Sequence, residues 1–448
     1  MREVRLFNSL GNKMEVFSPI KEGEVSFYFC GPTVYNDPHI GNMRPVIVFD
    51  TWRRLFLKLG YKVSFTSNYT DVDDKIINRA ISLGITEKEL TDDVIKEYRR
   101  LVDESNSLQP DNTPKPSVYM DKIIKYIQDL VDNGKAYVVD GDVYFRVNSD
   151  KYYGELSGNS IEALNQGARI EINSKKESPL DFALWKKTEV GIKWDSPWSQ
   201  GRPGWHSECC VMIDSIYREN NGYIDIHGGG FDLKFPHHEN EIAQSLAHND
   251  NHLAKYWLHN GFIDVENQKM SKSLGNVILA KDVFATYGAM PFRLMLLNTH
   301  YRAPLPFSEK TISEAQTQYT RICQTLKQIS VKLQLNFRNL EKLEEKPIDE
   351  FLDELCNDLN TPNALTILYA EIKNANNLLR VREINYDLLE ESYSKILQYL
   401  SLLGIRVSLP VLTEEDREIF GLYNQAKAEK DFEKSDKYRA ILIERKIL

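Results

Sequence analysis

The stretch CGPTVYNDPHIGNMR, residues 30–44, lies between two regular segments of the chain. The run before it, EVSFYF at residues 24–29, is strongly apolar, which is typical of a strand buried on both faces. The run after it is apolar at helical spacing, and Gly60 predicts the end of that helix. A second strand pattern, YKVSFTSNY, follows at residues 61–69. A strand, a helix and a strand in this order predict a parallel sheet with a right-handed crossover.

Length and composition narrow the class of protein. At 448 residues the chain is too long for one core, so several domains are expected. The sequence has no signal peptide and no apolar run long enough to span a membrane, and its five cysteines do not make a disulfide framework. We therefore expect a cytoplasmic protein. The net charge of −9 argues weakly against nucleic acid as a partner, so any RNA contact requires local basic patches.

The pattern along the chain predicts an α/β protein followed by helices. We expect a Rossmann-type parallel-sheet catalytic domain in two halves, residues 1–110 and 201–255. An inserted connective subdomain at 111–200 contains a predicted hairpin that turns at Asp140-Gly141. A linker subdomain at 256–307 carries the string KMSKS. An all-α C-terminal helical bundle at 308–405 then precedes a last region at 406–448.

Four helical details follow from local patterns. PHHENEIAQSLAH, residues 236–248, predicts a helix. One apolar stripe from Ile312 to Leu333 predicts a long helix. NTPNAL predicts a helix with Thr361 as its N-cap and Pro362 at its first position. Residues 413–446 form one last helical segment in this interpretation.

Two loops favour binding of phosphate groups. A glycine-containing turn that holds His39 precedes a helix N-terminus, which attracts anions. In QKMSKSLGN, residues 268–276, Lys269 and Lys272 place two ammonium groups on one loop, which suits a polyphosphate. The alternatives are a loop shaped only by turn chemistry and a solvated pair of lysines. Gly228 to Gly230 end another predicted strand, where they form either a close approach to a nucleotide or a tight turn.

Three separate segments carry candidate metal ligands. Thiolate, imidazole and carboxylate groups together suit tetrahedral zinc. Cys30 is the first candidate, and Glu241 is a carboxylate within one helical turn of two histidines. Spacing alone leaves two pairs of alternatives open, Cys209 or Cys210 and His237 or His238. Cys323 and Cys356 lie in helical patterns and are interpreted as ordinary buried cysteines.

Six ordered strings resemble one family of enzymes. They are FYFCGPTVYNDPHIG, NYTDVDDKI, GRPGWHSEC, DIHGGGFDLKFPHHENEIAQS, KMSKSLGN and LNTPNAL, and they span residues 27–365. HIGN followed by KMSKS resembles the paired HIGH and KMSKS signatures of class I aminoacyl-tRNA synthetases, and the full set resembles the cysteinyl-tRNA synthetase family. One departure is that Asn42 replaces the second histidine of HIGH. Its amide donates a hydrogen bond but carries no charge.

The resemblance implies the function and the residues that serve it. L-Cysteine reacts with ATP to give cysteinyl-adenylate and pyrophosphate, and the cysteinyl group then passes to the 3′ end of tRNA(Cys). Catalysis and ATP binding are implied for His39, Asn42, Lys269 and Lys272, with Gly41, Gly228, Gly229 and Gly230 also contacting ATP, which carries Mg²⁺. The amino-acid site is implied to contain Gly31, Thr70, Trp205 and Asp232. One zinc that recognises the substrate thiolate is implied to be bound by Cys30, Cys209, His237 and Glu241.

Further expectations concern the C-terminal region and the assembly. The resemblance implies that 406–448 recognises the anticodon, with Lys427, Asp436 and Arg439 as candidate contacts to tRNA. The family continues with an acidic tail that contains Gly and Trp, whereas this sequence ends at ERKIL, so we expect an incomplete anticodon platform. The protein is expected to be a monomer with no membrane partner.

Two other functions stay open at this stage. A ligase that joins cysteine to an amino sugar in mycothiol synthesis has the same catalytic core, and charging of tRNA distinguishes the two. A non-catalytic zinc-dependent sensor of cysteine is the second alternative, and the two motif lysines argue against it. A zinc hydrolase is disfavoured because the sequence has no HExxH string.

Overall fold

The computed structural model describes residues 2–159, 175–265, 268–269 and 277–448. The chain folds into two compact units. Unit 1 consists of Met1–Thr286, His300–Phe307 and Cys356–Leu359. Unit 2 consists of Tyr287–Thr299, Ser308–Leu355 and Asn360–Leu448.

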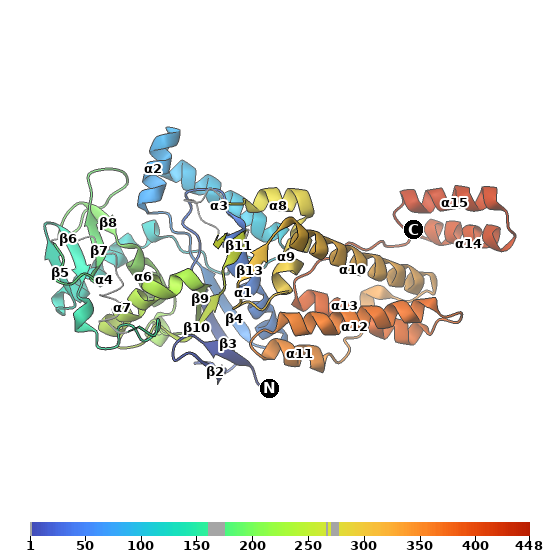
Figure 1. The fold of residues 1–448 in the computed structure, drawn as a ribbon, viewed down its shortest axis with the longest axis horizontal. Coiled ribbons are helices and arrows are strands. Elements are labelled where there is room, and N and C mark those ends of the chain that lie inside the picture. The colour runs from blue at the N-terminus through green and yellow to red at the C-terminus, as the bar shows by residue number, and fades with distance from the viewer. Residues whose placement is uncertain (1, 160–174, 266–267, 270–276) are drawn as a thin grey trace. The chain divides into compact units, whose positions relative to one another are not determined.

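A parallel sheet forms the centre of unit 1 (Figure 1). Among the described residues its strand order is β10-β9-β3-β4, and every neighbouring pair is parallel. The strands are β3 (Glu24–Phe29), β4 (Lys62–Ser67), β9 (Ile224–Gly230) and β10 (Ala254–Asn260). Helix α1 (Ile40–Lys58) connects β3 to β4, and Gly60 follows its end with a φ of +88°. The predicted strand-helix-strand unit is therefore confirmed, and all four strands end at one edge of the sheet.

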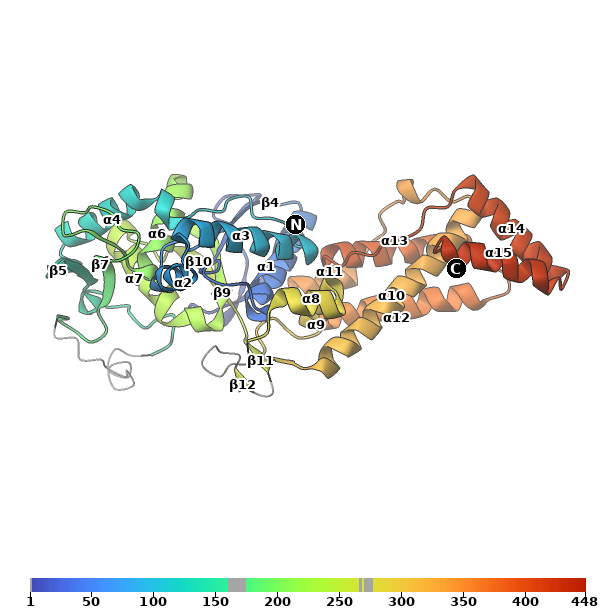
Figure 2. The same cartoon turned by 90° about the horizontal axis from the view of Figure 1, so that it is seen from above.

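The chain between β4 and β9 contains helices and a second sheet. The helices are α2 (Asp74–Leu83), α3 (Glu87–Glu104), α4 (Met120–Asp132) and α6 (Trp205–Ile216). The strands β5 (Ala136–Val139), β6 (Asp142–Phe145), β7 (Phe182–Lys187) and β8 (Gly201–Pro203) form an antiparallel sheet in sequence order. Figure 2 shows this sheet beside α4 and α6. Asp140 and Gly141 both have positive φ, which confirms the predicted hairpin turn.

The helix after β9 begins later than its sequence pattern predicts. Helix α7 spans Glu239–Asn249, whereas the pattern predicts a helix from residue 236. A short 3₁₀ turn (Phe231–Leu233) and an irregular turn (Lys234–His238) come first, and Phe235 within the latter has extended dihedral angles. Phe235 lies just before the predicted start at residue 236, and His238 already has helical dihedral angles, so the difference is confined to the first turn, which is irregular instead of α-helical.

Several short elements complete unit 1. They are β1 (Arg5–Asn8), β2 (Lys13–Val16), β11 (Ile263–Val265), β12 (Gln268–Lys269), α8 (Ala280–Tyr287) and β13 (Leu305–Phe307). Strand β11 pairs antiparallel with β12 and parallel with β13. The segment 356–359 joins them through Asp358, whose carboxylate accepts hydrogen bonds from the backbone of Phe7, the Tyr301 hydroxyl and the Arg302 guanidinium. These bonds hold three distant parts of the chain in one unit.

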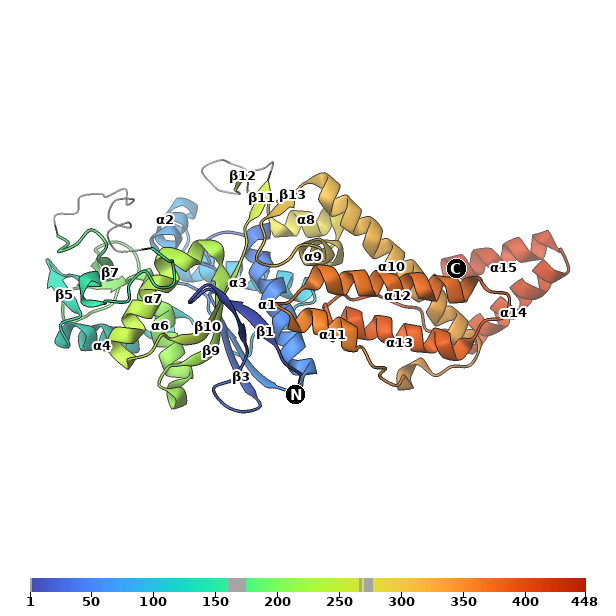
Figure 3. The ribbon, with the colours of Figure 1, turned by 60° about the horizontal axis from the view of Figure 1, so that its bottom comes forward.

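Unit 2 is helical wherever the structure describes regular elements. Its helices are α9 (Ala289–Leu297), α10 (Glu309–Leu335), α11 (Asp349–Cys356), α12 (Thr361–Arg380), α13 (Tyr386–Leu402), α14 (Glu414–Ala428) and α15 (Phe432–Glu444). Figure 3 shows α10, α12 and α13 side by side. The α/β class followed by an all-α bundle is thus confirmed, and Ile312 and Leu333 are both buried on α10.

Two helical details differ from the sequence interpretation. Asn360 is the N-cap of α12, and its side chain accepts the backbone N–H of Asn363, so Thr361 is already the first helical residue. Asparagine caps as well as threonine does, and the pattern did not separate the two. The C-terminal segment is two helices, because Lys430 has a φ of +59° and Asp431 caps α15. Within the described chain, no helix is both long and apolar enough to span a bilayer.

Candidate active site and metal centre

A cavity of about 340 Å³ opens at the carboxyl edge of the parallel sheet. This position is where open α/β sheets bind their ligands. The sequence-predicted residues that line it are Cys30, Gly31, His39, Gly41, Asn42, Trp205, Gly230 and Asp232. The first five belong to the segment 30–44, so that segment forms one wall of the cavity.

The N-terminus of α1 faces this cavity. His39 is the N-cap, and its backbone N–H donates to Asn42 Oδ1 at 3.0 Å. The first turn contains no acidic residue. The positive end of the helix dipole is therefore free of competing carboxylates in that turn. An anion, such as a phosphate group, suits this end of the cavity.

Both described flanks of the KMSKS segment adjoin the cavity. On one side, β12 ends at Lys269, which pairs with Asp264 of β11. On the other, the backbone N–H of Ile40 donates to the carbonyl of Ile278, and the N–H of Ala280 donates to that of Pro38. Lys272 lies outside the described residues, and the side chain of Lys269 is not described.

Gly31 permits a close approach between two loops. A Cβ atom at this position would lie 1.7 Å from the backbone oxygen of Asn68. The N–H of Gly31 also donates to Asn68 Oδ1, and Asn68 Nδ2 donates to the hydroxyl of Thr70. Thr70 is buried and does not line the cavity. Gly31 and Thr70 are thus joined through Asn68.

The three glycines of β9 have different surroundings. A Cβ atom at Gly228 would meet the ring of Phe49 at 2.5 Å, and one at Gly229 would meet Leu233 and His238. Protein side chains therefore occupy the space that these two glycines leave. Gly230 lines the cavity instead. The geometry brings only this glycine to the surface available to a ligand.

The aromatic and acidic candidates for the amino-acid site lie at the same cavity. Trp205 is 39% exposed and stacks on the ring of His237, with centroids 4.1 Å apart and planes 17° apart. Asp232 is exposed in the turn after β9. An aromatic wall and a carboxylate therefore border one opening.

A buried group of Cys30, Cys209, His237 and Glu241 lies beside the cavity. Tetrahedral zinc with usual bond lengths places two sulfur ligands about 3.8 Å apart, and a sulfur and a nitrogen about 3.5 Å apart. The two sulfur atoms are 3.7 Å apart, and His237 Nε2 lies 3.5 Å from Cys30 Sγ and 3.9 Å from Cys209 Sγ. Glu241 Oε1 lies 3.0 Å from His237 Nε2. The donor set and its spacing fit zinc.

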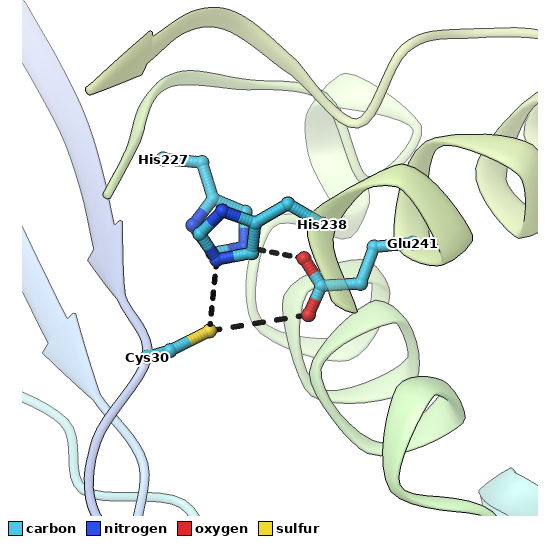
Figure 4. A group of neighbouring side chains, drawn as sticks. All are labelled: Cys30, His227, His238 and Glu241. Atoms are coloured by element: carbon cyan, nitrogen blue, oxygen red, sulfur yellow. Dashed lines mark hydrogen bonds and ion pairs between the residues drawn. The ribbon is translucent and has the colours of Figure 1, made fainter. Parts of the chain in front are cut away.

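A second buried group shares two of these residues. Figure 4 shows Cys30 and Glu241 together with His227 and His238. His238 Nε2 is 3.4 Å from Cys30 Sγ, and His227 Nε2 is 3.0 Å from Glu241 Oε2. His227 stacks on the fully buried Trp257, whereas His237 stacks on Trp205 at the cavity. The first group therefore borders the cavity, and the second faces the protein core.

Burial and neighbouring side chains shift the pKa values of the candidate ligands. The hydrogen bond with the Cys30 thiol lowers the pKa of Cys209 to about 7, against the effect of burial. Burial lowers the pKa of His237, but Glu241 and Cys209 outweigh it and raise that pKa to about 10. Burial also lowers the pKa of His238, which keeps this imidazole neutral. A thiolate at Cys209 near neutral pH is the form that binds a metal.

Cys210 lies on the same helix as Cys209 but points elsewhere. Its sulfur atom is 3.6 Å from the carbonyl oxygen of His206 and 3.5 Å from that of Glu241. Neither of the two candidate groups in the described residues includes it.

The sequence interpretation missed two residues beside the site. His227 is a polar residue within the apolar strand β9, and this mismatch is the signal that could have identified it. Arg44 is buried, and its guanidinium donates to the carbonyl oxygens of Tyr301 and Ala303 at 3.2 and 2.6 Å. Burial lowers the pKa of Arg44 to about 10, which leaves it charged at neutral pH. Arg44 thus fixes α1 to the chain around β11 and β13.

The three candidate contacts to tRNA lie in unit 2. Lys427 is on α14, and Asp436 and Arg439 are on α15, and all three are exposed. The Lys427 ammonium lies over the ring of Tyr423 at 5.2 Å. Nothing in their geometry distinguishes them from other charged surface residues.

Comparisons with known families and sequences agree on one class of protein. Residues 16–317 match the family described as tRNA synthetases class I (C) catalytic domain, and residues 350–408 match the DALR domain. A cysteine–tRNA ligase from Acholeplasma laidlawii is 45% identical over 442 residues, which cover 99% of both chains. A cysteine–tRNA ligase from Halalkalibacterium halodurans is 42% identical over 445 residues, which cover 97% of this chain and 95% of the relative.

Solved structures of distant relatives share the fold. Methionyl-tRNA synthetase from Mycobacterium tuberculosis, bound by methionyl-adenylate, aligns with a TM-score of 0.62 at 14% identity and covers 92% of this chain and 96% of its own. A leucyl enzyme from Agrobacterium radiobacter, in a ternary complex with tRNA, aligns with a TM-score of 0.61 at 12% identity and covers 87% and 84%. At these identities the likeness concerns the fold alone.

Proposed function

The chain belongs to the cysteine–tRNA ligases, a family of class I aminoacyl-tRNA synthetases, and on that premise we propose that it joins L-cysteine to tRNA(Cys). In the first step, a carboxylate oxygen of cysteine attacks the α-phosphorus of ATP, and pyrophosphate leaves. In the second, a hydroxyl of the terminal adenosine of tRNA attacks the activated carbonyl, and AMP leaves. Neither step forms a covalent bond to the protein, so positioning and charge stabilisation carry the catalysis.

One observation carries this proposal. Cys30 both lines the cavity and belongs to the buried group of two thiols, an imidazole and a carboxylate. A ligand in the cavity is therefore in reach of a soft metal site on one side and of the α1 N-terminus on the other. The thiol of cysteine requires the soft metal site, and the phosphates of ATP require the helix N-terminus.

The phosphate end of the proposed site is built from α1 and the two motif lysines. His39, Gly41 and Asn42 face the phosphates, and the amide group of Asn42 supplies a neutral donor. Lys269 and Lys272 approach from the opposite side and neutralise charge on the departing pyrophosphate. Mg²⁺ accompanies ATP. The absence of acidic residues in the first turn of α1 supports this assignment.

The amino-acid end of the proposed site is built around Trp205 and Asp232. The carboxylate of Asp232 binds the substrate ammonium, and Trp205 forms a wall against the side chain. Gly31 lines this end, and the buried Thr70 acts on it through Asn68, which hydrogen-bonds to both residues. Gly230 gives the nucleotide room, whereas Gly228 and Gly229 act by admitting Phe49, Leu233 and His238.

We assign Cys30, Cys209, His237 and Glu241 as the ligands of one zinc ion. When bound, zinc supplies a soft ligand site that favours the thiolate of cysteine over the hydroxyl of serine. His206 Nδ1 lies 3.0 Å from His237 Nδ1, and this contact orients the His237 ring. The stacking of Trp205 on the His237 ring supports the same orientation.

The remaining assignments concern tRNA and the cellular setting. Residues 406–448 recognise the anticodon, with Lys427, Asp436 and Arg439 as contacts. We also propose that the chain has the five regions given in the sequence analysis, that it is a monomer and that it is cytoplasmic. Relatives named as tRNA ligases support a cytoplasmic location indirectly.

Cysteine-dependent exchange between ATP and radioactive pyrophosphate tests the function. Exchange with cysteine, followed by charging of tRNA(Cys), is the expected result. Exchange without charging, with ligation of cysteine to an amino sugar, would indicate the amino-sugar ligase instead. Absence of any exchange would indicate a cysteine sensor and would contradict the proposal.

A further inference from the structure

Arg44 is a buried cation in the wall of the cavity. It lies five residues after the N-cap His39 of α1, is 1% exposed and lines the cavity. Its guanidinium donates to the backbone carbonyls of Phe262 at 2.5 Å, Tyr301 at 3.2 Å and Ala303 at 2.6 Å. Within the described chain, no ion pair joins it to a carboxylate. A buried charge that is held by carbonyl groups alone is costly, so these contacts call for a role of their own.

Two of the carbonyls that Arg44 binds also take part in backbone hydrogen bonds. The carbonyl of Tyr301 accepts the N–H of Gly261 at 2.8 Å, and the carbonyl of Phe262 accepts the N–H of Leu305 at 2.9 Å. These bonds join the segment after β10 to the segment that leads into β13. Arg44 therefore binds at a junction of two connections, both of which belong to unit 1.

This junction forms part of the cavity wall. Residues 260–263 line the cavity from the junction, and His39, Gly41 and Asn42 line it from the N-terminus of α1. Strand β11, which begins in the junction, lies next to α1 (Figure 1). Arg44 is rooted in α1 and binds the segment 260–263, so its side chain sets the spacing between these two parts of the wall.

We propose that Arg44 is a positioning residue for adenylate formation, which holds residues 260–263 in place relative to the helix N-terminus where ATP phosphates are proposed to bind. The inference rests on the proposed function and deepens it, because it gives the nucleotide end of the cavity a supporting residue that takes no part in the chemistry. A planar guanidinium holds several carbonyls in fixed directions, which the single ammonium of lysine does not. A displacement of about 1 Å in a bound reactant can cost on the order of 10²-fold in rate.

The amino-acid end of the cavity has different supports. Trp205 begins α6, and Asp232 lies in the turn after β9. The carbonyls that accept hydrogen bonds from Arg44 lie in neither of these elements. We therefore expect loss of the guanidinium to affect the use of ATP and to spare the binding of cysteine.

The test compares Arg44→Met with the matched variant Arg53→Met. Arg53 is a second buried arginine of α1, but its guanidinium donates to the carbonyl of Gln109 and pairs with Asp111, and none of these residues lines the cavity. Each substitution removes a buried guanidinium from the same helix, so the thermal midpoint should fall in both variants.

Kinetics of cysteine-dependent pyrophosphate exchange, measured below both thermal midpoints, separate the two arginines. Arg44→Met should raise the KM for ATP and lower kcat, each on the order of tenfold, and should leave the KM for cysteine unchanged. Arg53→Met should change neither KM. A lower kcat with both KM values unchanged in Arg44→Met, as expected for a smaller folded fraction, would show that Arg44 supports folding alone and would overturn the proposal.

Two further measurements separate shape from charge, and this proposal from the function on which it rests. Arg44→Lys is a milder change that keeps the charge and loses the planar fork, so it should still raise the KM for ATP. Wild-type constants in Arg44→Lys would overturn the positioning role. A wild-type protein without exchange would refute the proposed function. The Kd for ATP, measured by calorimetry, would then still decide the role of Arg44, since it should rise in Arg44→Met and stay constant in Arg53→Met.

Discussion

The sulfur atoms of Cys30 and Cys209 lie 3.7 Å apart, although 179 positions separate the two residues in the sequence. Cys30 directly follows strand β3, and Cys209 lies in the first turns of α6. The insertion that contains the β5–β8 sheet lies between them in the chain. The parallel sheet therefore brings two thiols together at the edge where the cavity opens.

The first prediction concerns the metal. The protein as purified should contain about one equivalent of zinc, and Cys209→Ala should lose most of it, because three ligands do not close a tetrahedral site. Cys210→Ala is the matched control and should keep its zinc, since the Cys210 sulfur contacts backbone carbonyls instead. Atomic absorption measures both variants.

The overlapping second group supplies the contrary outcome. If zinc is bound by Cys30, Glu241, His227 and His238, then His238→Ala loses the metal and Cys209→Ala keeps it. That result would move the metal toward Trp257 and away from the cavity.

The second prediction separates two roles of Asn42. Its side-chain oxygen caps the backbone N–H of His39, and its amide N–H₂ is proposed to donate to phosphate. Asn42→Asp keeps the capping oxygen but replaces the donor with a negative charge. The thermal midpoint should therefore hold, since the helix dipole favours an acid there, whereas the KM for ATP should rise on the order of tenfold or more.

Two other substitutions complete this comparison. Asn42→His should keep activity, because the family has histidine at this position. Asn42→Ala should lose both the cap and the donor. Equal rates of adenylate formation in Asn42→Ala and in the wild type would leave Asn42 with a structural role only.

The third prediction concerns Lys272. Its charge is proposed to stabilise the departing pyrophosphate, so its removal should cost more in the transition state than in ATP binding. Lys272→Ala should lower kcat for adenylate formation on the order of 10²-fold or more. Lys255→Ala is a control at the amino end of β10, where the ammonium donates to the carbonyl of Ser18, and it should change neither constant. A change confined to the KM for ATP would contradict the assigned role.

The fourth prediction concerns pH and the α14–α15 pair. Burial raises the pKa of Asp416, but hydrogen bonds from Arg445 and the Thr413 backbone outweigh it and leave that pKa below its ordinary value. The carboxylate therefore stabilises the folded pair at pH values above the unfolded pKa of about 4, and this contribution is lost as the pH falls through the lower folded value.

Hydrogen exchange at matched pH measures this effect. Arg445→Met should speed exchange of peptides from residues 414–444 about threefold at pH 6, and the difference from wild type should shrink at pH 3. Lys437→Met, which removes an exposed charge from the same helix, is the control. An increase that is the same at both pH values would show that Arg445 acts by packing alone.

The sequence predicted the elements whose signals are local. Gly60 and the Asp140-Gly141 turn are positions where backbone geometry selects the residue, and both predictions were confirmed. The strand and helix periods around residues 30–44 placed the parallel sheet correctly. The relatives confirm the family that the six strings indicate.

Features that depend on distant contacts were not predictable in this way. His227 joins the buried cluster because β9 lies next to β3, and no spacing in the sequence encodes that neighbour. The irregular first turn before α7 does not follow from the apolar spacing, and the N-cap of α12 is Asn360, one residue earlier than the predicted Thr361. Which histidine completes the metal group also stays a prediction, because both lie within reach of Cys30.

The bonds of Asp358 have a consequence for how the chain can be divided. The chain leaves unit 1, returns for residues 300–307, leaves again, and returns once more for 356–359. A protease cut in residues 308–355 would therefore not release a complete catalytic piece, since the carboxylate that binds Phe7, Tyr301 and Arg302 would remain on the other fragment. A chimaera that takes its helical bundle from a relative must therefore keep residues 356–359 of this chain. Otherwise the relative's segment must supply a carboxylate at the same place.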